Sequence, residues 1–485
     1  MKEFLEYQKD IANLEYTINL LSWELKINAP IGSNDDLINL ISSYEKKLFE
    51  LSTNEKYGKL LNDTINSKEY SLLEAAEKRY INNIQKHYEN YKKVPQDFYL
   101  EYAKTQKTTN VIWKEAKEKK DYNMFKPYLE NMIELTKKYY RFLEPNSTNI
   151  YDVMLNKYEM GINTKIIDRL FNELKEGIKD LIPESTSNVT SITYNYTNEE
   201  LINVANYLLE YIGFDLKRGT LGIYPHGFTE KIATNDIRIA FSHTTDPIDF
   251  VMTIIHEGGH AIFEQNIKEN LSKYENSTIE DLYALHESQS RFYENMLGRN
   301  KNFWIPIYND MKEMLHLDMD IDEFVKLLNT PKCNAIRCIS DELTYCMHII
   351  LRYEIEKDIF NNKIKVSDIP NEWNKKTKEY LHVDVRDDSE GLMQDVHWSE
   401  GSFGYFPSYL IGSIYDGMFL EAIRDDLGNI DELLKSGNIK KITKYLIDNI
   451  YVNGGAYSSK EILNKICKKE LTSEPLIKYF KKKYK

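Results

Sequence analysis

Cysteine, proline and glycine are all scarce in this chain. Its 485 residues include 4 cysteines, 12 prolines and 20 glycines. Four cysteines are too few for the disulfide framework that stabilises many secreted proteins, so we expect reduced thiols and a cytoplasmic location. Because proline and glycine are the residues that helix interiors tolerate least, their scarcity predicts long helices.

Long apolar runs and an excess of basic residues are also missing. No stretch reaches the roughly 18 consecutive apolar residues of a membrane-spanning helix. Charges recur throughout residues 1–30, where a signal peptide would have an apolar core. The net charge of −13 argues against a protein that binds nucleic acid, which needs a basic face for the phosphates. We therefore expect a soluble protein that binds neither membranes nor nucleic acids.

The distribution of apolar residues predicts a mainly α-helical fold. Residues 67–94 and 123–143 place apolar side chains three or four positions apart, with Lys and Glu between them. Residues 216–245 differ, because Gly and Pro interrupt them and residues 237–241 favour strands, so we expect a small antiparallel sheet or hairpin there. No repeat or linker divides the chain. We expect one domain over residues 1–485, whose helices could form two lobes around one groove.

A potential metal site lies in the helix that follows this segment. Asp246 and Pro247 are suited to the N-cap and first position of a helix. His256 and His260 stand four residues apart, so both imidazoles lie on one face and can bind the same Zn²⁺. Glu257 is turned about 100° from His256, which suits a general base that reaches a water molecule rather than the metal.

A catalytic zinc site needs a third protein ligand from another element. The next predicted helix has a capping pattern at Ser277 and Glu280, and Gly298 suits its end. Glu287 lies off the apolar stripe of this helix and is our preferred third ligand. His286 is an alternative because imidazole also binds zinc, and Glu280 is a weaker one.

With these residues in place, the chain resembles the carboxypeptidase Taq family of metallocarboxypeptidases, also called thermostable carboxypeptidase 1. HEGGHAIFEQ and HESQSRFYEN resemble the family's metal-binding blocks. The resemblance continues through most of the chain, in order. The other matching blocks are residues 20–30, 151–161, 335–356 and 391–415.

The resemblance implies a fold, an activity and a set of site residues. It implies a large helical fold with a deep groove, similar to neurolysin and angiotensin-converting enzyme, and a homodimer. It implies removal of single amino acids from peptides with a free C-terminus. Carried over residue by residue, His256, His260 and Glu287 are the metal ligands and Glu257 is the general base. Zinc is the expected ion, and cobalt is the alternative.

Two arginines are candidates for binding the C-terminal carboxylate of a peptide. Arg238 matches the family's Asp-x-Arg-x-Thr motif and Arg337 its Ile-Arg-x-x-Ala-Asp motif. The planar guanidinium group can hold a carboxylate through two hydrogen bonds, which suits this task. The alternative for each is a structural salt bridge, to Asp236 for Arg238 and to Asp341 for Arg337.

Three further residues are candidates for stabilising the transition state. His397, in the segment that resembles the family's Gly-x-x-Gln-Asp-x-His-Trp block, could donate a hydrogen bond to the oxyanion or hold a metal ligand. Tyr405 and Tyr409 could donate through their phenol groups. The sequence leaves open which tyrosine does so, and core packing is the alternative for either.

The sequence departs from the family pattern near the expected substrate site. The family's His-Pro-Phe motif is His226-Gly227-Phe228 here, and Ala240 replaces the Thr of the Arg238 motif. We expect His226 to contribute to substrate binding from a loop that the lost proline makes looser. These departures concern substrate preference, because the metal ligands and Glu257 are all present.

These observations predict a metal-dependent carboxypeptidase that uses a metal-activated water molecule. An endopeptidase or dipeptidase on the same helical fold is the first alternative, and a non-catalytic metal-binding scaffold is the second. Gly258 and Gly259 remain unusual, since each costs a helix about 1 kcal/mol relative to Ala. We predict that a side chain at either position would crowd the helix of Glu287 or the strand of Arg238.

Overall fold

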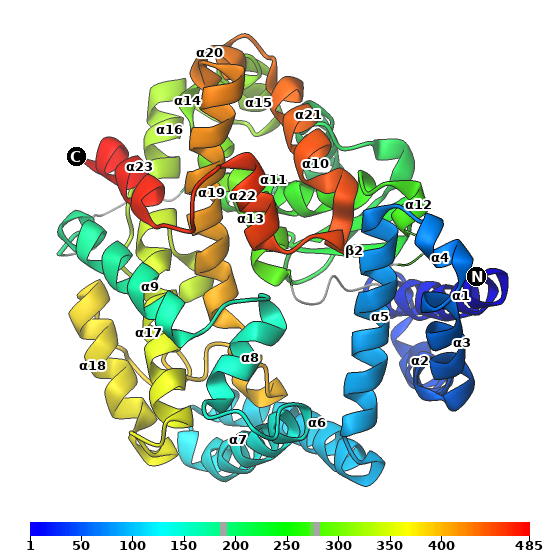
Figure 1. The fold of residues 1–485 in the computed structure, drawn as a ribbon. Helices are drawn as coiled ribbons and strands as arrows, with labels where there is room; N and C mark the ends of the chain where they lie inside the picture. Colours follow the sequence, from blue (N-terminus) through cyan, green and yellow to red (C-terminus); the bar gives the residue numbers. More distant parts are fainter. Residues whose placement is uncertain (185–191, 273, 275–281) are drawn as a thin grey trace.

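The computed structural model describes residues 1–184, 192–272, 274 and 282–485. It is mainly helical, as predicted, with one small sheet among the described residues (Figure 1). None of the helices in this part of the chain is both long and apolar enough to cross a membrane.

The N-terminal region is a series of helices, which confirms the helical periodicity of residues 67–94 and 123–143. The helices of this region are α1 (Lys2–Ile27), α2 (Asn34–Thr53), α3 (Glu55–Ile65), α4 (Lys68–Leu72), α5 (Ala75–Lys93), α6 (Gln96–Lys119), α7 (Tyr122–Leu143), α8 (Ile150–Tyr158), α9 (Thr164–Ile178) and α10 (Asn198–Ile212). In Figure 1, α1 to α3 stand to one side, and α6 and α7 lie at the end of the molecule opposite α20.

In the remaining region, helix α19 has mostly buried side chains and contacts α13, α17 and α20 to α23. Helix α13 packs along α19, and α11 packs against α10, α13 and the sheet. Figure 1 shows α19 running through the middle of the molecule, with α11 and α13 near it. The helices of this region are α11 (Pro247–Gln265), α12 (Glu269–Ser272), α13 (Tyr283–Arg291), α14 (Lys301–Trp304), α15 (Tyr308–Met314), α16 (Ile321–Asn329), α17 (Glu342–Phe360), α18 (Ile369–Leu381), α19 (Phe406–Leu427), α20 (Ile430–Lys435), α21 (Ile439–Asn449), α22 (Ser459–Ile466) and α23 (Glu474–Tyr484).

The sheet contains β1 (Leu221–Ile223), β2 (Phe228–Ala233) and β3 (Asp236–Phe241), in the order β1-β3-β2. Strands β2 and β3 form the predicted antiparallel hairpin, but β1 pairs in parallel with β3, so the sheet is mixed rather than antiparallel. The apolar β3 strand is the most buried of the three and takes the central position. Strands β1 and β2 therefore both pair with β3 rather than with each other.

Helix α11 begins and packs as the sequence predicts. The carboxylate of Asp246 accepts hydrogen bonds from the backbone N–H groups of Ile248 and Asp249, at 2.8 and 3.2 Å, and Pro247 occupies the first turn. Ile254 and Ile262 are fully buried in the core. This packing fixes the rotation of α11 and directs the opposite face, with both histidines of HEGGH, towards a cavity.

The helix that carries Glu287 is α-helical in its first part and π-helical in its second. Helix α13 ends at Arg291, and the chain continues as a π-helix, η4 (Phe292–Gly298), which ends at Gly298 as predicted. The predicted capping pattern of Ser277 and Glu280 lies outside the described residues. A π-helix has more residues per turn than an α-helix, so it changes which side chains follow Glu287 on the same face.

Candidate metal centre

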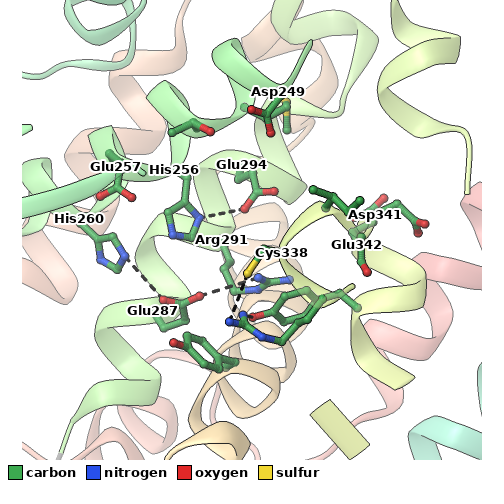
Figure 2. Close-up of a pocket in the computed structure, with 18 of the residues that line it drawn as sticks. Asp249, His256, Glu257, His260, Glu287, Arg291, Glu294, Cys338, Asp341 and Glu342 are labelled. Atoms are coloured by element: carbon green, nitrogen blue, oxygen red, sulfur yellow. Dashed lines mark hydrogen bonds and ion pairs between the residues drawn. The ribbon is translucent and has the colours of Figure 1, made fainter. Parts of the chain in front are cut away.

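A cavity of about 1110 Å³ lies where α11, α13, η4, β2 and the start of α19 meet. The segment between α16 and α17 forms another wall of this cavity. Figure 2 shows charged side chains from these elements converging on it, among them His256, Glu287 and Glu294.

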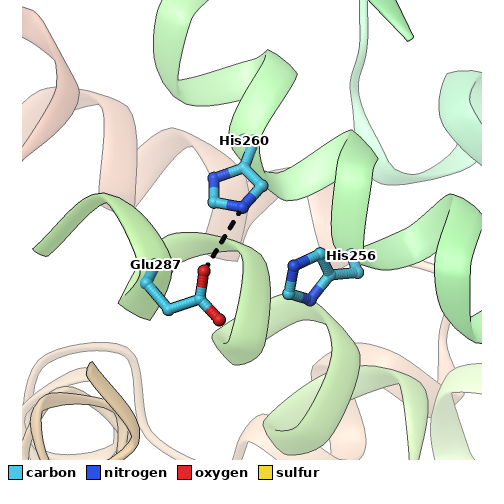
Figure 3. Close-up of side chains that lie close together, drawn as sticks. All are labelled: His256, His260 and Glu287. Atoms are coloured by element: carbon cyan, nitrogen blue, oxygen red, sulfur yellow. Dashed lines mark ion pairs between the residues drawn. The ribbon is translucent and has the colours of Figure 1, made fainter. Parts of the chain in front are cut away.

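Three metal-binding side chains converge in this cavity. The donor atoms of His256, His260 and Glu287 lie within 4.8 Å of one another. His260 Nε2 on α11 lies 3.6 Å from a carboxylate oxygen of Glu287, whose side chain extends from α13 towards α11 (Figure 3). Two imidazoles and a carboxylate are a common donor set for catalytic zinc. The three residues therefore fit a divalent cation, and the cavity leaves room for a further ligand.

The two glycines of HEGGH allow close packing on both sides of α11. A Cβ atom on Gly259 would lie 2.6 Å from the Cα of Ser290 and 2.8 Å from the carbonyl oxygen of Gln289, both in the backbone of α13. The crowding predicted with the helix of Glu287 is confirmed at this position. A Cβ atom on Gly258 would instead meet the side-chain ends of Leu209 and Ile212 in α10, not the strand of Arg238.

We expect Gly259→Ala to lower the free energy of unfolding by about 1–3 kcal/mol, because backbone atoms of α13 must move. The movement would displace Glu287, so Zn²⁺ affinity should fall as well. Gly258→Ala is the matched control: flexible side-chain ends can yield, and Ala favours the helix by about 1 kcal/mol. Urea unfolding and zinc titration measure both effects. Equal behaviour of the two variants would contradict this reading.

The ring of His256 is held by a carboxylate from η4. Its Nδ1–H donates to Glu294 at 2.9 Å, and Arg299 lies 3.5 Å from the other oxygen of Glu294. Burial by itself would lower the pKa of His256, but the carboxylates of Glu294, Glu287 and Glu257 raise this pKa to about 9. Because Nδ1 is engaged, Nε2 is the ring nitrogen that can bind a metal.

The surroundings of His260 differ. Its Nδ1 lies 2.8 Å from Nδ1 of His286, and burial together with His286 lowers the pKa of His260 to about 4. The other ring nitrogen of His286 contacts Glu264 at 3.0 Å. Both nitrogens of His286 thus face protein partners, and His286 is not among the three side chains whose donor atoms converge. Glu280, the weaker alternative, lies outside the described residues.

Glu287 combines burial with cationic neighbours. Burial would raise its pKa, yet the two histidines and Arg291 lower the pKa of Glu287 to about 2. Arg291 lies 3.8 Å from the carboxylate and donates a hydrogen bond to Ser413 in α19 at 2.7 Å. An ionised carboxylate is the form that binds a metal ion.

Glu257 lies beside these residues and is only 7% exposed. Burial, the largest influence, raises the pKa of its carboxyl group. The hydroxyl of Thr229 in β2 donates to this carboxylate at 2.8 Å and to the Glu257 carbonyl oxygen at 3.0 Å. A carboxylate whose pKa is raised towards neutrality is a better proton acceptor at physiological pH. Sequence reasoning missed Thr229, because no motif marks a strand residue that contacts the helix only after folding.

The two candidate arginines lie in different environments. Arg337 lines the cavity, and its guanidinium contacts Asp395 at 2.9 Å and the Tyr345 hydroxyl at 2.9 Å. Asp395 is shared with Arg352, at 2.6 Å. The salt bridge of Arg337 is therefore with Asp395, whereas Asp341, the partner in the alternative structural role, caps α17.

Arg238 is held on the sheet rather than in the cavity. Its guanidinium donates two hydrogen bonds to Asp236, at 2.9 and 2.8 Å, and lies 5.5 Å from the ring of Trp23. It is absent from the residues that line the cavity. The salt bridge to Asp236 that was the alternative for Arg238 is therefore present. A role of Arg238 in binding a carboxylate stays a prediction.

Tyr405 and Tyr409 both line the cavity, and their rings lie 5.1 Å apart. His397 is behind Tyr409: its Nε2 lies 3.2 Å from the Tyr409 hydroxyl. Burial lowers the pKa of His397 to about 3, so this ring is neutral. A neutral His397 can accept the hydrogen of the Tyr409 hydroxyl or donate to its oxygen, and either contact orients the phenol.

His226 is exposed on the loop between β1 and β2. Its Nδ1 lies 3.1 Å from the carbonyl oxygen of Gly227, and its ring packs near Tyr224 and Phe228. Gly227 and Phe228 line the cavity, whereas His226 stands beside them. The loop therefore borders the cavity, and substrate binding by His226 stays a prediction.

Known proteins resemble this chain over its whole length. The family model of the carboxypeptidase Taq (M32) metallopeptidases matches residues 3–484. The chain is 35% identical to carboxypeptidase 1 of Bacillus subtilis, covering 100% of this chain and 97% of that protein. It is 28% identical to thermostable carboxypeptidase 1 of Thermus thermophilus, over 100% and 98%. A solved structure of Pyrococcus furiosus carboxypeptidase superposes with a TM-score of 0.93 at 27% identity, over 100% and 98% of the two chains.

Proposed function

Because the chain belongs to the carboxypeptidase Taq (M32) family and is a metal-dependent carboxypeptidase, we propose that it releases single amino acids from peptides with a free C-terminus. We propose His256, His260 and Glu287 as its metal ligands and Glu257 as its general base. The observation that carries this proposal is the convergence of the three donor groups within 4.8 Å, with Glu257 beside them in one cavity.

Zinc is the ion that we propose for this site, with cobalt as the alternative, since two imidazoles and one carboxylate suit either ion. The bound cation supplies Lewis-acid activation of a water molecule and of the scissile carbonyl. Glu294 supports the proposal because it leaves Nε2 of His256 free for the cation. The low pKa of Glu287 supports it as well, because the carboxylate stays ionised.

Glu257 would accept the proton of the attacking water molecule and pass it to the leaving amine. Its hydrogen bond with Thr229 holds the carboxylate in place during both transfers. The phenols of Tyr405 and Tyr409 are positioned in the cavity to donate to the developing oxyanion, and His397 orients Tyr409.

Arg337 is the residue that we propose for binding the C-terminal carboxylate. It lines the cavity, is fixed by Asp395, and its side chain is 11% exposed. A guanidinium group binds a carboxylate with defined geometry, which would place the scissile bond near Glu257. We also propose a single catalytic unit over residues 1–485 that acts as a homodimer, as the family resemblance implies. The scarcity of cysteines supports a cytoplasmic location.

Digestion of a mixture of unblocked peptides, followed by mass spectrometry, tests the proposed function. We expect a series of products that are each one residue shorter at the C-terminus. A chelator should abolish the series, and added Zn²⁺ or Co²⁺ should restore it, because the cation activates the water molecule. Internal cleavage would indicate an endopeptidase, and hydrolysis of dipeptides alone, with longer peptides left intact, would indicate a dipeptidase. Comparing rates with the two ions identifies the better metal.

A further inference from the structure

A chain of three polar side chains lies behind His260. His286 on α13 contacts His260 at 2.8 Å, measured between the two Nδ1 atoms, and contacts Glu264 on α11 through Nε2 at 3.0 Å. The other carboxylate oxygen of Glu264 lies 3.0 Å from the Nζ of Lys231 on β2. Three separate elements thus meet behind one proposed metal ligand.

The direction of the hydrogen bonds in this chain follows from its far end. Glu264 and Lys231 are largely buried, at 10% and 13% side-chain exposure, and form an ion pair, so Glu264 is an ionised carboxylate that can only accept. Nε2 of His286 must therefore donate its hydrogen to Glu264. In a neutral His286, Nδ1 then carries no hydrogen and can only accept.

We propose that His286, anchored by Glu264 and Lys231, is a positioning residue that keeps His260 in the tautomer with its hydrogen on Nδ1. In that tautomer the Nε2 lone pair of His260 points towards Glu287, where the cation would bind. The inference rests on the proposed assignment of His260 as a metal ligand. His286 itself would not touch the cation or the substrate.

The rings of His260 and His286 are stacked, with planes 16° apart and centroids 4.6 Å apart, and the 2.8 Å between their Nδ1 atoms is a hydrogen-bond distance, so both contacts hold the ring of His260. Phe263 packs against His286 edge to face. His256 is held by a shorter route, because its Nδ1 contacts the carboxylate of Glu294 directly. Glu264 does not contact Nδ1 of His260 in this way, since the carboxylate of Glu264 lies between His286 and Lys231.

Two variants separate the hydrogen bonds of His286 from its volume. His286→Phe keeps a planar ring but removes both hydrogen bonds, whereas His286→Gln offers one acceptor and one donor on the same amide. His243→Phe is the control, because His243 is an exposed histidine that contacts Asn198 outside the cavity. Zn²⁺ affinity is measured by competition with a coloured chelator, and thermal unfolding of the metal-free proteins checks that each variant is folded.

We expect His286→Phe to bind Zn²⁺ about 10- to 100-fold more weakly, the usual cost of losing a residue that orients a metal ligand. His286→Gln should recover most of this loss, and His243→Phe should match the unchanged protein. NMR of the zinc-loaded protein with ¹⁵N-labelled histidine gives a second readout. When Nε2 of His260 binds the cation, its Nδ1–H should give a hydrogen-bonded, slowly exchanging proton signal in the unchanged protein, and this signal should be lost in His286→Phe.

The outcomes distinguish this inference from the proposed function. If His286→Phe binds Zn²⁺ as tightly as the unchanged protein, or if His286→Gln is as weak as His286→Phe, the positioning role is wrong. If instead the unchanged protein binds Zn²⁺ no better than a His260→Ala variant, the proposed metal site itself is wrong. Both comparisons use metal binding alone, so they do not depend on which peptides are cleaved.

Discussion

Replacing Glu257 with Gln should reduce the rate of peptide hydrolysis by about 10²- to 10⁴-fold, the usual contribution of a general base. The amide has nearly the same shape and can still accept the hydrogen bond from Thr229, so the cavity should keep its form. What is lost is the ability to take a proton from water. Steady-state hydrolysis of a free-acid peptide measures the loss, and it should appear in kcat.

Zinc binding separates loss of the base from damage to the site. Glu257→Gln should bind Zn²⁺ nearly as well as the unchanged protein, because Glu257 is not one of the three converging ligands. Glu230→Gln is the matched control: Glu230 lines the same cavity but pairs with Lys26 at 3.6 Å, and its loss should leave kcat nearly unchanged. If Glu257→Gln hydrolyses peptides at the normal rate, the assignment of Glu257 as the general base is wrong.

Replacing Arg337 with Met should weaken cleavage of free-acid peptides by about 10²-fold or more, mainly through KM. Loss of one partner from a buried, hydrogen-bonded charge pair costs about 2–5 kcal/mol. The variant does not leave Asp395 unpaired, because Arg352 holds its other oxygen at 2.6 Å. The loss of activity can therefore be attributed to the missing contact with the peptide carboxylate rather than to an unpaired Asp395.

Peptides with an amidated C-terminus complete the experiment. The unchanged protein should cleave them poorly, and Arg337→Met should cause little further loss, because the carboxylate that Arg337 binds is already missing. Arg238→Met is the second arm, since Asp236 holds Arg238 outside the cavity, and we expect it to leave kcat/KM within about threefold. A large loss of kcat/KM in Arg238→Met, with none in Arg337→Met, would show that Arg238 rather than Arg337 binds the peptide carboxylate. Equal cleavage of amidated and free-acid peptides would favour an endopeptidase.

Local sequence rules predicted the elements of the site because its key features are local. Asp246 and Pro247 begin α11 as expected, and the spacing of His256 and His260 puts both on one face. Strand β3 was predicted from its own apolar residues. Its parallel pairing with β1 was not, because that pairing depends on which strand takes the centre of the sheet.

The contacts that orient the site residues could not be predicted in the same way. No motif marks Thr229, and although Asp395 and Glu264 lie in blocks that resemble the family, nothing in the sequence indicates their partners. Each of the three reaches its partner only when distant segments pack together. Asp341 was a reasonable partner for Arg337 by proximity in the sequence, but folding brings Asp395 closer. The glycines of HEGGH show the same limit: their need for space was predictable, whereas the neighbour of Gly258 was not.

The sharing of Asp395 by two guanidinium groups leaves this wall of the cavity one negative charge short. Arg352 is fully buried, so only Arg337 can meet an anion from solution. If Arg337 binds the peptide carboxylate as proposed, the substrate supplies the counter-ion that this pair of guanidinium groups lacks. Release of the free amino acid then leaves Arg337 ready for the carboxylate of the shortened peptide.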